Sequence, residues 1–564
     1  MSRDDWEISG YDRDVAVKLV HDGVNPLLAV LLASRGLSGR EDVRFLTEES
    51  CLPLYDPMQM RDMDRAVARL RRAIEDREHV AVHGDYDVDG LTSVCLLTNY
   101  LRGKGLTCET YIPERLEGYG VKAQSLELLR EKGVTLVITV DCGITAAEEA
   151  EYAKTLGLDM IITDHHECKE RLPDAAAVID PKRPDCSYPN CALAGVGVAF
   201  KLVCAMEGAD RTDALLSEYG DLVALGTIAD VMPVVGENRL LIRRGVEEIR
   251  RGGRAGIRHL AVASGCESSR DVSMNCVGFS LAPRLNAAGR LGNISAALEL
   301  LMAQDDETAE RLAQELCEMN RTRQQMVNDV YGDAVRMLEA DPPEGRPIVI
   351  ASDKWHQGVA GIVASRLAEA YLLPAVVICV ENGSGRGSCR SVGDFNLFAV
   401  LSKCADLLDH FGGHEMAAGL TVREDLIPEL RRRLGEAYSA AAAKISKPAL
   451  HVDFEVVKPG LLTVENVESL SLLEPFGNGN PSPLLCMQNV GVTGVIPLSG
   501  GRHTKLTVRK NGESFDCIFF CRTAKEIGVR EGDTADLAFT PQINEFRGRR
   551  SVQFLLADVS PDRP

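Results

Sequence analysis

The chain has 564 residues, 45% of them apolar and 26% charged, which is enough for roughly three or four domains and too balanced for a disordered protein. The formal net charge of −20 argues against a protein that coats DNA without sequence preference, and a nucleic-acid enzyme of this charge must gather its Lys and Arg along a groove. No apolar run approaches the roughly 18 residues of a membrane span, and the first residues lack the basic and apolar regions of a signal peptide, so we expect a cytoplasmic protein. The 17 cysteines lack Cys-x-x-Cys pairs, which indicates buried reduced thiols rather than a zinc or disulfide framework.

The predicted elements change character along the chain. Residues 1–50 have a helical, charged pattern and are expected to form an N-terminal extension. Over residues 51–240, short β-rich apolar runs alternate with amphipathic segments, which predicts βαβ units and a parallel sheet. This pattern predicts helices over 61–76, 91–102 and 145–156 and strands over 80–83, 135–140 and 160–163. Residues 241–340 are expected to be helical and to end in one long helix over 297–340 that joins two domains.

A second α/β domain is predicted over residues 341–445, with strands beginning at 347 and at 375. From residue 446 to 564 the pattern changes to alternating strands and Gly-rich turns, including a hairpin turn at 547–549. This predicts a C-terminal β-barrel of the OB-fold type.

Carboxylate and imidazole side chains stand where the predicted strands and helices of the first α/β domain end. These groups are His83, Asp87, Asp89, Asp141, Asp164, His165, His166 and Asp230. Because ligands of an open parallel sheet gather outside the carboxyl ends of its strands, we expect the groups to converge on one site. Asp and His together suit one or two divalent ions, Mg²⁺ or Mn²⁺, and two such ions can hold a phosphodiester and activate a water molecule. The alternative is that the acidic residues only cap helices and end strands. This alternative could explain any single aspartate, but it explains the whole group poorly. The pattern therefore predicts a metal-dependent phosphodiesterase.

The motifs Asp-Tyr-Asp-Val-Asp-Gly, Asp-His-His and Gly-Thr-Ile-Ala-Asp-Val resemble the ordered motifs of the DHH phosphoesterase superfamily. The likeness is greatest to its bacterial single-strand-specific 5′→3′ DNA exonucleases, and it runs from about residue 50 to the C-terminus. The resemblance implies a first metal held by His83, Asp87 and Asp141, and a second held by Asp89, Asp141, His165 and Asp230. It also implies that His166 faces the scissile phosphate, so that Asp89, Asp141 and His166 act in catalysis. Asp85 has no ligand role in this pattern and is expected to cap or support the site.

The same resemblance implies substrate contacts outside the metal cluster. Segment 282–290 suits bidentate phosphate contacts, although a solvated helix face is the alternative. Segment 411–419 resembles a substrate-binding motif of the DHHA1 domain. Its paired glycines are expected just before a helix, where they let backbone N–H groups approach a phosphate closely. The alternative is that the glycines only allow the chain to pack tightly as it enters the helix. Ser388 and Arg390 resemble a pocket for the 5′ phosphate, which Arg115 completes unless it is an ordinary surface arginine. The predicted contacts are Arg115, Arg284, Asn286, Arg290, His356, Ser388, Arg390, Gly412, Gly413 and His414.

The C-terminal barrel is expected to follow a single-stranded backbone with basic residues and to stack bases on Phe546, or else to serve only for packing. The basic candidates are Arg502, Lys505, Arg509, Arg547, Arg549 and Arg550.

Together these features predict a single-stranded-DNA-specific 5′→3′ exonuclease that releases mononucleotides by two-metal hydrolysis in DNA repair and recombination. A narrow groove would exclude duplex DNA, and the expected partners are single-stranded DNA, a single-strand-binding protein and a repair helicase, with the chain itself a monomer. One alternative is a DHH oligoribonuclease or cyclic-dinucleotide phosphodiesterase, which generally lacks the barrel and segment 282–290. Another is a non-catalytic DNA-binding scaffold, which would have lost its metal ligands, whereas every expected ligand position is filled here.

Overall fold

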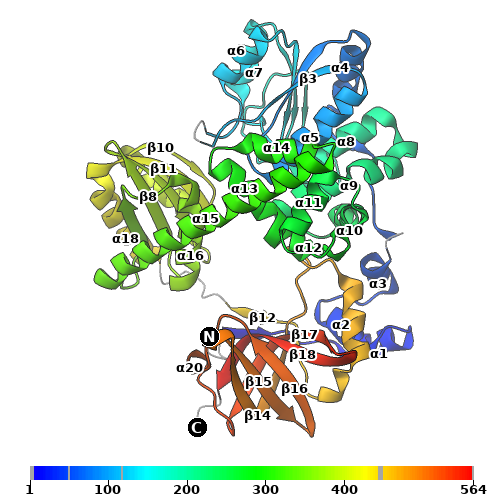
Figure 1. Ribbon diagram of the computed structural model, residues 1–564, viewed down its shortest axis with the longest axis vertical. Coiled ribbons are helices and arrows are strands. Elements are labelled where there is room, and N and C mark those ends of the chain that lie inside the picture. The colour runs from blue at the N-terminus through cyan, green and yellow to red at the C-terminus, as the bar shows by residue number, and fades with distance from the viewer. Residues whose placement is uncertain (1–4, 49–50, 116–117, 442–448, 562–564) are drawn as a thin grey trace. The chain divides into compact units, whose positions relative to one another are not determined.

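The structure is a computed structural model that describes residues 5–48, 51–115, 118–441 and 449–561. The chain divides into two units (Figure 1). The larger unit comprises Tyr55–Met232 and Leu241–Ser446, and the smaller unit comprises Met1–Leu54, Pro233–Leu240 and Lys447–Pro564. Among the described helices, none combines the length and the apolar character that a membrane crossing requires.

A five-stranded parallel sheet of order β3-β2-β4-β5-β6 forms the first half of the larger unit. Its strands are β2 (His79–His83), β3 (Thr107–Tyr111), β4 (Leu136–Val140), β5 (Asp159–Thr163) and β6 (Ala177–Ile179). The central strand β4, Leu-Val-Ile-Thr-Val, is buried at every position, as expected of a mostly apolar strand covered on both faces. The accompanying helices are α4 (Met63–Glu75), α5 (Val88–Gly103), α6 (Ala123–Glu131), α7 (Ala147–Thr155), α8 (Gly195–Glu207) and α9 (Thr212–Ala229). The parallel sheet predicted from the alternating pattern is confirmed.

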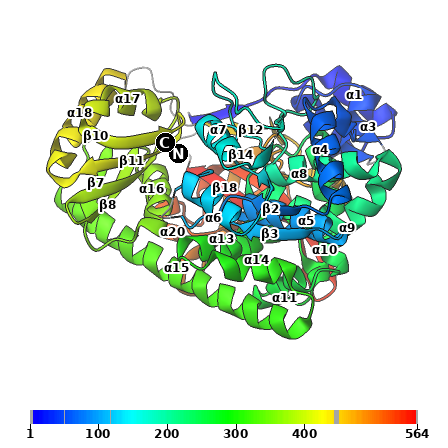
Figure 2. The ribbon, with the colours of Figure 1, turned by 90° about the horizontal axis from the view of Figure 1, so that it is seen from above.

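A helical region follows and leads into the longest helix of the larger unit, α15 (Asp306–Ala340). The preceding helices are α10 (Gly236–Arg251), α11 (Ala255–Ala263), α12 (Met274–Cys276), a π-helix (Val277–Leu281), α13 (Ala282–Arg290) and α14 (Ile294–Met302). The prediction of one helix over 297–340 is wrong at its start, because the chain leaves helical geometry after Met302 and Asp305 caps a new helix by accepting from the N–H of Thr308. Figure 2 shows α15 extending from α11 to α16.

The second half of the larger unit is a mixed five-stranded sheet of order β10-β11-β9-β8-β7. Its strands are β7 (Ile348–Ser352), β8 (Ala375–Glu381), β9 (Ser384–Arg390), β10 (Leu408–Gly413) and β11 (Ala417–Arg423), and its helices are α16 (Gln357–Tyr371), α17 (Leu397–Lys403) and α18 (Ile427–Ala441). Side chains alternate along β7: Ile348 and Ile350 pack with α15 and α16, whereas Val349 packs with α17 and α18. The predicted second α/β domain is therefore present, with helices on both faces of its sheet.

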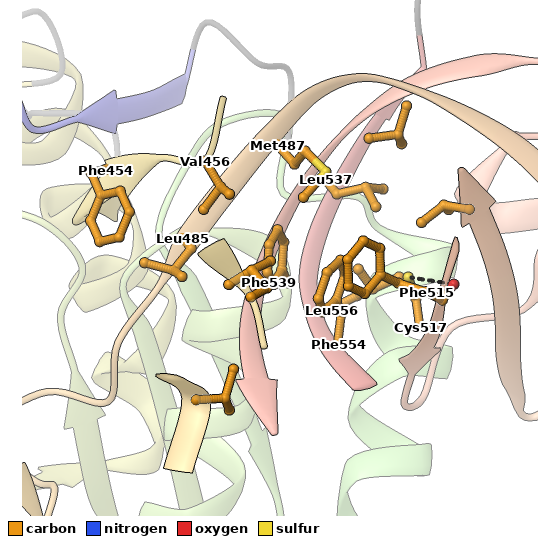
Figure 3. Close-up of a cluster of buried hydrophobic side chains, with 14 of the residues drawn as sticks. Phe454, Val456, Leu485, Met487, Phe515, Cys517, Leu537, Phe539, Phe554 and Leu556 are labelled. Carbon is orange, nitrogen blue, oxygen red and sulfur yellow. Dashed lines mark hydrogen bonds between the residues drawn. The ribbon is translucent and has the colours of Figure 1, made fainter. Parts of the chain in front are cut away.

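The smaller unit contains a closed barrel of five strands, β14, β15, β16, β18 and β17, in which β17 pairs back with β14. The strands are β14 (Leu485–Leu498), β15 (His503–Lys510), β16 (Glu513–Phe519), β17 (Thr534–Phe546) and β18 (Arg549–Pro561), with β13 (Phe454–Glu455), α19 (Val464–Glu468) and α20 (Ala524–Ile527) around them. Phe539 and Phe554 stack in its interior with ring centroids 3.9 Å apart (Figure 3). Arg547 and Gly548 both have positive φ between β17 and β18, which confirms the predicted hairpin turn.

The N-terminal segment is part of this smaller unit. Strand β1 (Trp6–Ile8) pairs in parallel with β12 (Leu450–Val452), and apolar residues of α1 (Arg13–His21) and α2 (Pro26–Ser34) join the barrel's core cluster. Asn25 donates a 2.9 Å hydrogen bond to Asn466, and helix α3 (Arg40–Thr47) completes the segment. Residues 5–48 thus pack on a barrel more than 400 positions further along the chain.

Candidate metal centre and nucleic-acid cleft

Acidic and imidazole side chains of the larger unit meet where its parallel strands end. His83 closes β2, Asp141 follows β4, and His165 follows β5, while Asp230 stands at the end of α9. Ligand atoms of three trios lie within 4.8 Å of one another. The trios are Asp85, Asp87 and Asp141; Asp89, His165 and Asp230; and Asp141, His165 and His166. The predicted convergence at the carboxyl ends of the strands is therefore present.

Asp89 and Asp141 are the most deeply buried carboxylates of the three trios. Asp89 accepts hydrogen bonds of 2.6 and 2.9 Å from the backbone N–H groups of Gly195 and Val196 at the start of α8. Asp141, whose φ of 57° is left-handed, places Oδ1 3.0 Å from Nε2 of His165. Burial, and then neighbouring acidic charge, hold the pKa of both carboxyls well above the usual range. Removing water from two adjacent carboxylates is costly unless cations balance them, so the cluster is suited to bound cations.

His165 supplies a neutral imidazole to the cluster. Its Nε2 lies 3.7 Å from carboxylate oxygens of both Asp89 and Asp230. Burial, followed by the charge of His166, lowers the pKa of His165 to about 3, so its ring is uncharged at neutral pH and keeps a lone pair for a metal. Burial raises the pKa of Asp230 to about 6, and one buried oxygen of Asp230 lacks a hydrogen-bond partner among the described residues. These donors fit a divalent ion.

Asp85 lies beside Asp87 and Asp141 in the first trio. Asp87 caps α5 by accepting from the N–H groups of Asp89 and Gly90. Asp85 is 4% exposed, and its buried Oδ1 has no hydrogen-bond partner within the described part of the chain. Burial and then the charge of Asp87 raise the pKa of Asp85 to about 8. An unpartnered buried carboxylate oxygen is the feature that a cation would satisfy.

His166 carries a different charge from its neighbour His165. Its Nδ1 lies 2.7 Å from Oδ1 of Asp164 and 3.0 Å from the hydroxyl of Tyr119. Burial alone would lower the pKa of His166, but the hydrogen bond and charge of Asp164 outweigh it and raise the pKa to about 9. His166 is therefore a cation at neutral pH, held through one ring nitrogen and suited to contact an anion through the other.

A cleft of about 1020 Å³ begins at His166 and is lined with basic and glycine residues from both halves of the larger unit. The lining includes Tyr86, Arg115, Tyr119, His166, Arg290, His356, Ser388, Gly412, Gly413 and His414. Burial lowers the pKa of Arg290 to about 10, and the like charges of neighbouring arginines add to the effect. These neighbours are Arg115, Arg323 and Arg390. Clustered arginines of like charge favour the binding of phosphate groups.

Three family models match successive parts of the chain. The DHH family N-terminal domain matches residues 79–227, the DHHA1 domain residues 345–440, and the RecJ OB domain residues 452–558. The single-stranded-DNA-specific exonuclease RecJ of Bacillus subtilis is 40% identical over 98% of this chain and 70% of that protein. The RecJ protein of Escherichia coli is 34% identical over 95% of this chain and 96% of that protein.

This chain belongs to the RecJ family.

A solved RecJ structure, that of the Thermus thermophilus protein in complex with Mn²⁺, matches 99% of this chain and 79% of that one, with a TM-score of 0.83 and 30% identity. A second structure of the same protein contains Mg²⁺ and has a TM-score of 0.78. The resemblance that the sequence motifs carried and the OB-fold prediction for the C-terminal barrel are both confirmed.

The structure bears on two further expectations about the RecJ-type site. His83 is not in the three trios of the described residues: its Nε2 lies 3.3 Å from Oγ of Ser125 and its ring stacks on Tyr111. Its role as a ligand therefore stays a prediction, and Asp85, beside Asp87 and Asp141, is a second candidate. Gly412 and Gly413 close strand β10 rather than precede a helix, and they lead into the hairpin to β11. Gly413 is required there because its φ is 142° and a Cβ would lie 2.4 Å from the carbonyl oxygen of Ala417.

The other predicted RecJ contacts separate into those on the cleft and those beside it. Arg284 and Asn286 belong to α13 but are not among the cleft-lining residues, and Arg284 donates to Sγ of Cys317 and to the carbonyl of Ser280. Arg390 lies at the end of β9, and its guanidinium donates to the backbone carbonyl of Cys389. His356 caps α16 through Nδ1, which accepts from the N–H of Gly358.

Two contributors went unnoticed in the sequence. Tyr119 reaches His166 from a loop that has no periodic pattern, so local sequence offered no sign of its role. The backbone donors at Gly195 and Val196 lie within a stretch rich in small residues at 192–197, which is the available sequence signal for a close approach.

Proposed function

We propose that the chain is a single-stranded-DNA-specific exonuclease that degrades its substrate from the 5′ end and releases mononucleotides, using two divalent ions, Mn²⁺ or Mg²⁺. The observation that carries the proposal is the position of His166, which belongs to a metal-type trio and also lines the arginine cleft. A phosphodiester in that cleft would therefore lie beside the acidic cluster. RecJ relatives named for this activity, and RecJ structures solved with Mn²⁺ and Mg²⁺, support it.

The residues present fit two ions. We propose that Asp85, Asp87 and Asp141 would hold one ion and that Asp89, His165 and Asp230 would hold the other, with Asp141 also close to His165 of the second set. Bound there, the ions would supply Lewis-acid charge for activating a water molecule and stabilising the leaving oxygen. Asp89 is fixed by two backbone N–H groups, and cationic His166 is oriented by Asp164, so both keep their positions when a phosphate enters.

The direction of digestion would follow from the cleft. We propose that Arg115, Arg290, Ser388 and Arg390 hold the 5′ phosphate, with Gly412, Gly413, His356 and His414 beside the first nucleotide. The guanidinium of Arg115 lies over the ring of Tyr86 at 4.9 Å, which fixes its plane for a bidentate contact. Arg284 and Asn286 on α13, and the basic residues of the barrel, would contact the strand further along.

The wider role follows from the family resemblance. We propose that the enzyme acts as a monomer in the cytoplasm, in DNA repair and recombination, with a single-strand-binding protein and a helicase that supply single strands.

The direct test is digestion with Mn²⁺ of a 5′-phosphorylated single strand labelled near each end in turn, beside a matched duplex and a short RNA. We expect nucleotides from the 5′ end first, none from the duplex, and no reaction with EDTA. Asp141→Ala should abolish cleavage, whereas Asp213→Ala, an exposed aspartate of α9, should not. An intact long strand beside a rapidly cleaved short RNA would contradict the proposal and favour a small-substrate phosphodiesterase.

A further inference from the structure

Phe279 is the most exposed large apolar side chain of the described residues, with 83% of its surface accessible. It lies in the π-helix Val277–Leu281, immediately before α13. A π-helical turn costs hydrogen-bond geometry relative to an α-helix and is found mostly at functional positions. An aromatic ring this exposed gains nothing for the fold, so its place in such a turn suggests a ligand.

The two ends of the π-helix hold Phe279 outward. Val277 and Leu281 are fully buried, and they stand two positions before and after Phe279. Because both neighbours are anchored in the core, the residue midway between them points away from it. The ring therefore has a fixed direction before any ligand binds.

Phe279 continues a row of residues along α13. Pro283, Asn286 and Arg290 follow it at intervals of four, three and four residues, which places all four on one face of a helix. Arg290 lies in the cleft, so the row begins at the candidate phosphate site. Eleven residues of helix span roughly 16 Å, and a strand stacked at about 3.4 Å per nucleotide covers that distance in about five nucleotides.

We propose that Phe279 is a stacking site for a nucleobase of the single strand, up to about five nucleotides from the 5′ end held near Arg290. A flat apolar ring accepts any base, which suits an exonuclease without sequence preference. The amide of Asn286 and the guanidinium of Arg290 on the same row favour a nucleic acid over an apolar protein surface. This assignment rests on the proposed function, because it gives the single-stranded DNA substrate a second point of attachment.

The test compares 5′-phosphorylated strands of about three and about twelve nucleotides, because only the longer one reaches Phe279. Phe279→Ala should raise KM for the long strand about tenfold and leave the short strand nearly unchanged, while Phe279→Trp should retain the long-strand KM. Val262→Ala, at a half-exposed apolar position on α11, is the matched control and should change neither. Circular dichroism would confirm that each variant is folded.

A second measurement does not depend on catalysis. A long strand carrying 2-aminopurine at about the fifth nucleotide should lose fluorescence on binding the unaltered protein in EDTA, and should keep it with Phe279→Ala. Equal effects of Phe279→Ala on both strand lengths, or no effect on either, would overturn the stacking site, and the latter would favour a protein partner for this ring. An unaltered protein that cleaves neither strand would instead overturn the proposed exonuclease function.

Discussion

A Cβ atom placed on Gly195 would lie only 2.6 Å from the Cβ of Asp141, so the first residue of α8 packs directly against the carboxylate at the centre of the metal cluster. The same helix start donates the hydrogen bonds that hold Asp89. Two carboxylates from different elements are thereby positioned by one helix N-terminus, whose partial positive charge also favours their ionised forms.

Replacing Gly195 with Ala should therefore displace Asp141 and impair catalysis. We expect kcat to fall about 100-fold with little loss of fold, because moving a catalytic group by about 1 Å has effects of this size. Gly103→Ala, at an open position near the end of α5, is the control and should retain full activity. Steady-state nuclease assays with Mn²⁺ measure both, and an unimpaired Gly195→Ala enzyme would show that Asp141 tolerates movement.

Asp85 and His83 give opposite expectations for metal binding. Asp85→Asn should weaken Mn²⁺ binding at least about tenfold, because its buried oxygen belongs to the first trio. His83→Asn should leave the affinity nearly unchanged, since its ring nitrogens lie near Ser125 and Cys142 instead. Isothermal titration calorimetry with Mn²⁺ decides between the two. A larger loss for His83→Asn would restore the ligand set that the sequence motifs implied.

The metal-free protein should become less stable as the pH rises. A carboxyl whose pKa is higher in the folded chain than in the unfolded one, such as Asp85 at about 8, stabilises the fold in its neutral form. That contribution is present below about pH 4 and is lost as the pH rises through about 8. In EDTA, the Tm of Asp85→Asn minus that of the unaltered protein should therefore increase from about pH 5 to about pH 8. A difference that does not vary with pH would contradict the raised pKa, and added Mn²⁺ should reduce it.

The aromatic stack in the barrel predicts a stability effect confined to the smaller unit. Phe539 is fully buried, and Phe539→Ala should lower the free energy of unfolding by roughly 3–5 kcal/mol. Phe546→Ala, at a 65% exposed position of the same strand, should have almost no effect on stability. Urea unfolding followed by circular dichroism measures both variants. Equal stabilities would mean that the barrel repacks around the missing ring.

Local sequence was sufficient for the parts of the site that depend on where strands end. The apolar run of β4 is followed directly by Asp141, and parallel pairing then brings it beside the ends of β2 and β5. It is not sufficient for side-chain reach within a loop, and for this reason the order of residues over 83–89 does not separate His83 from Asp85 as the ligand beside Asp87. The paired glycines at 412–413 suit a helix start as well as a tight hairpin, because glycine is common in both, and only the pairing of β10 with β11 separates the two cases.

The local sequence pattern also does not predict which distant segments pack together. The amphipathic residues of α1 and α2 predict helices but do not identify the partner of their apolar faces, which is the barrel. The end of α14 at Met302 is similar: a helical composition runs across the break, and the capping by Asp305 decides it.

The composition of the smaller unit also constrains the order of folding during synthesis. Its core needs both the first helices and the last strands of the chain. The whole of the larger unit lies between these two parts in the sequence. On the ribosome, the metal-binding unit therefore emerges complete while α1 and α2 still lack the barrel that covers their apolar residues. These two helices must wait for nearly the entire chain, and a truncation near the C-terminus would leave the N-terminus unprotected as well.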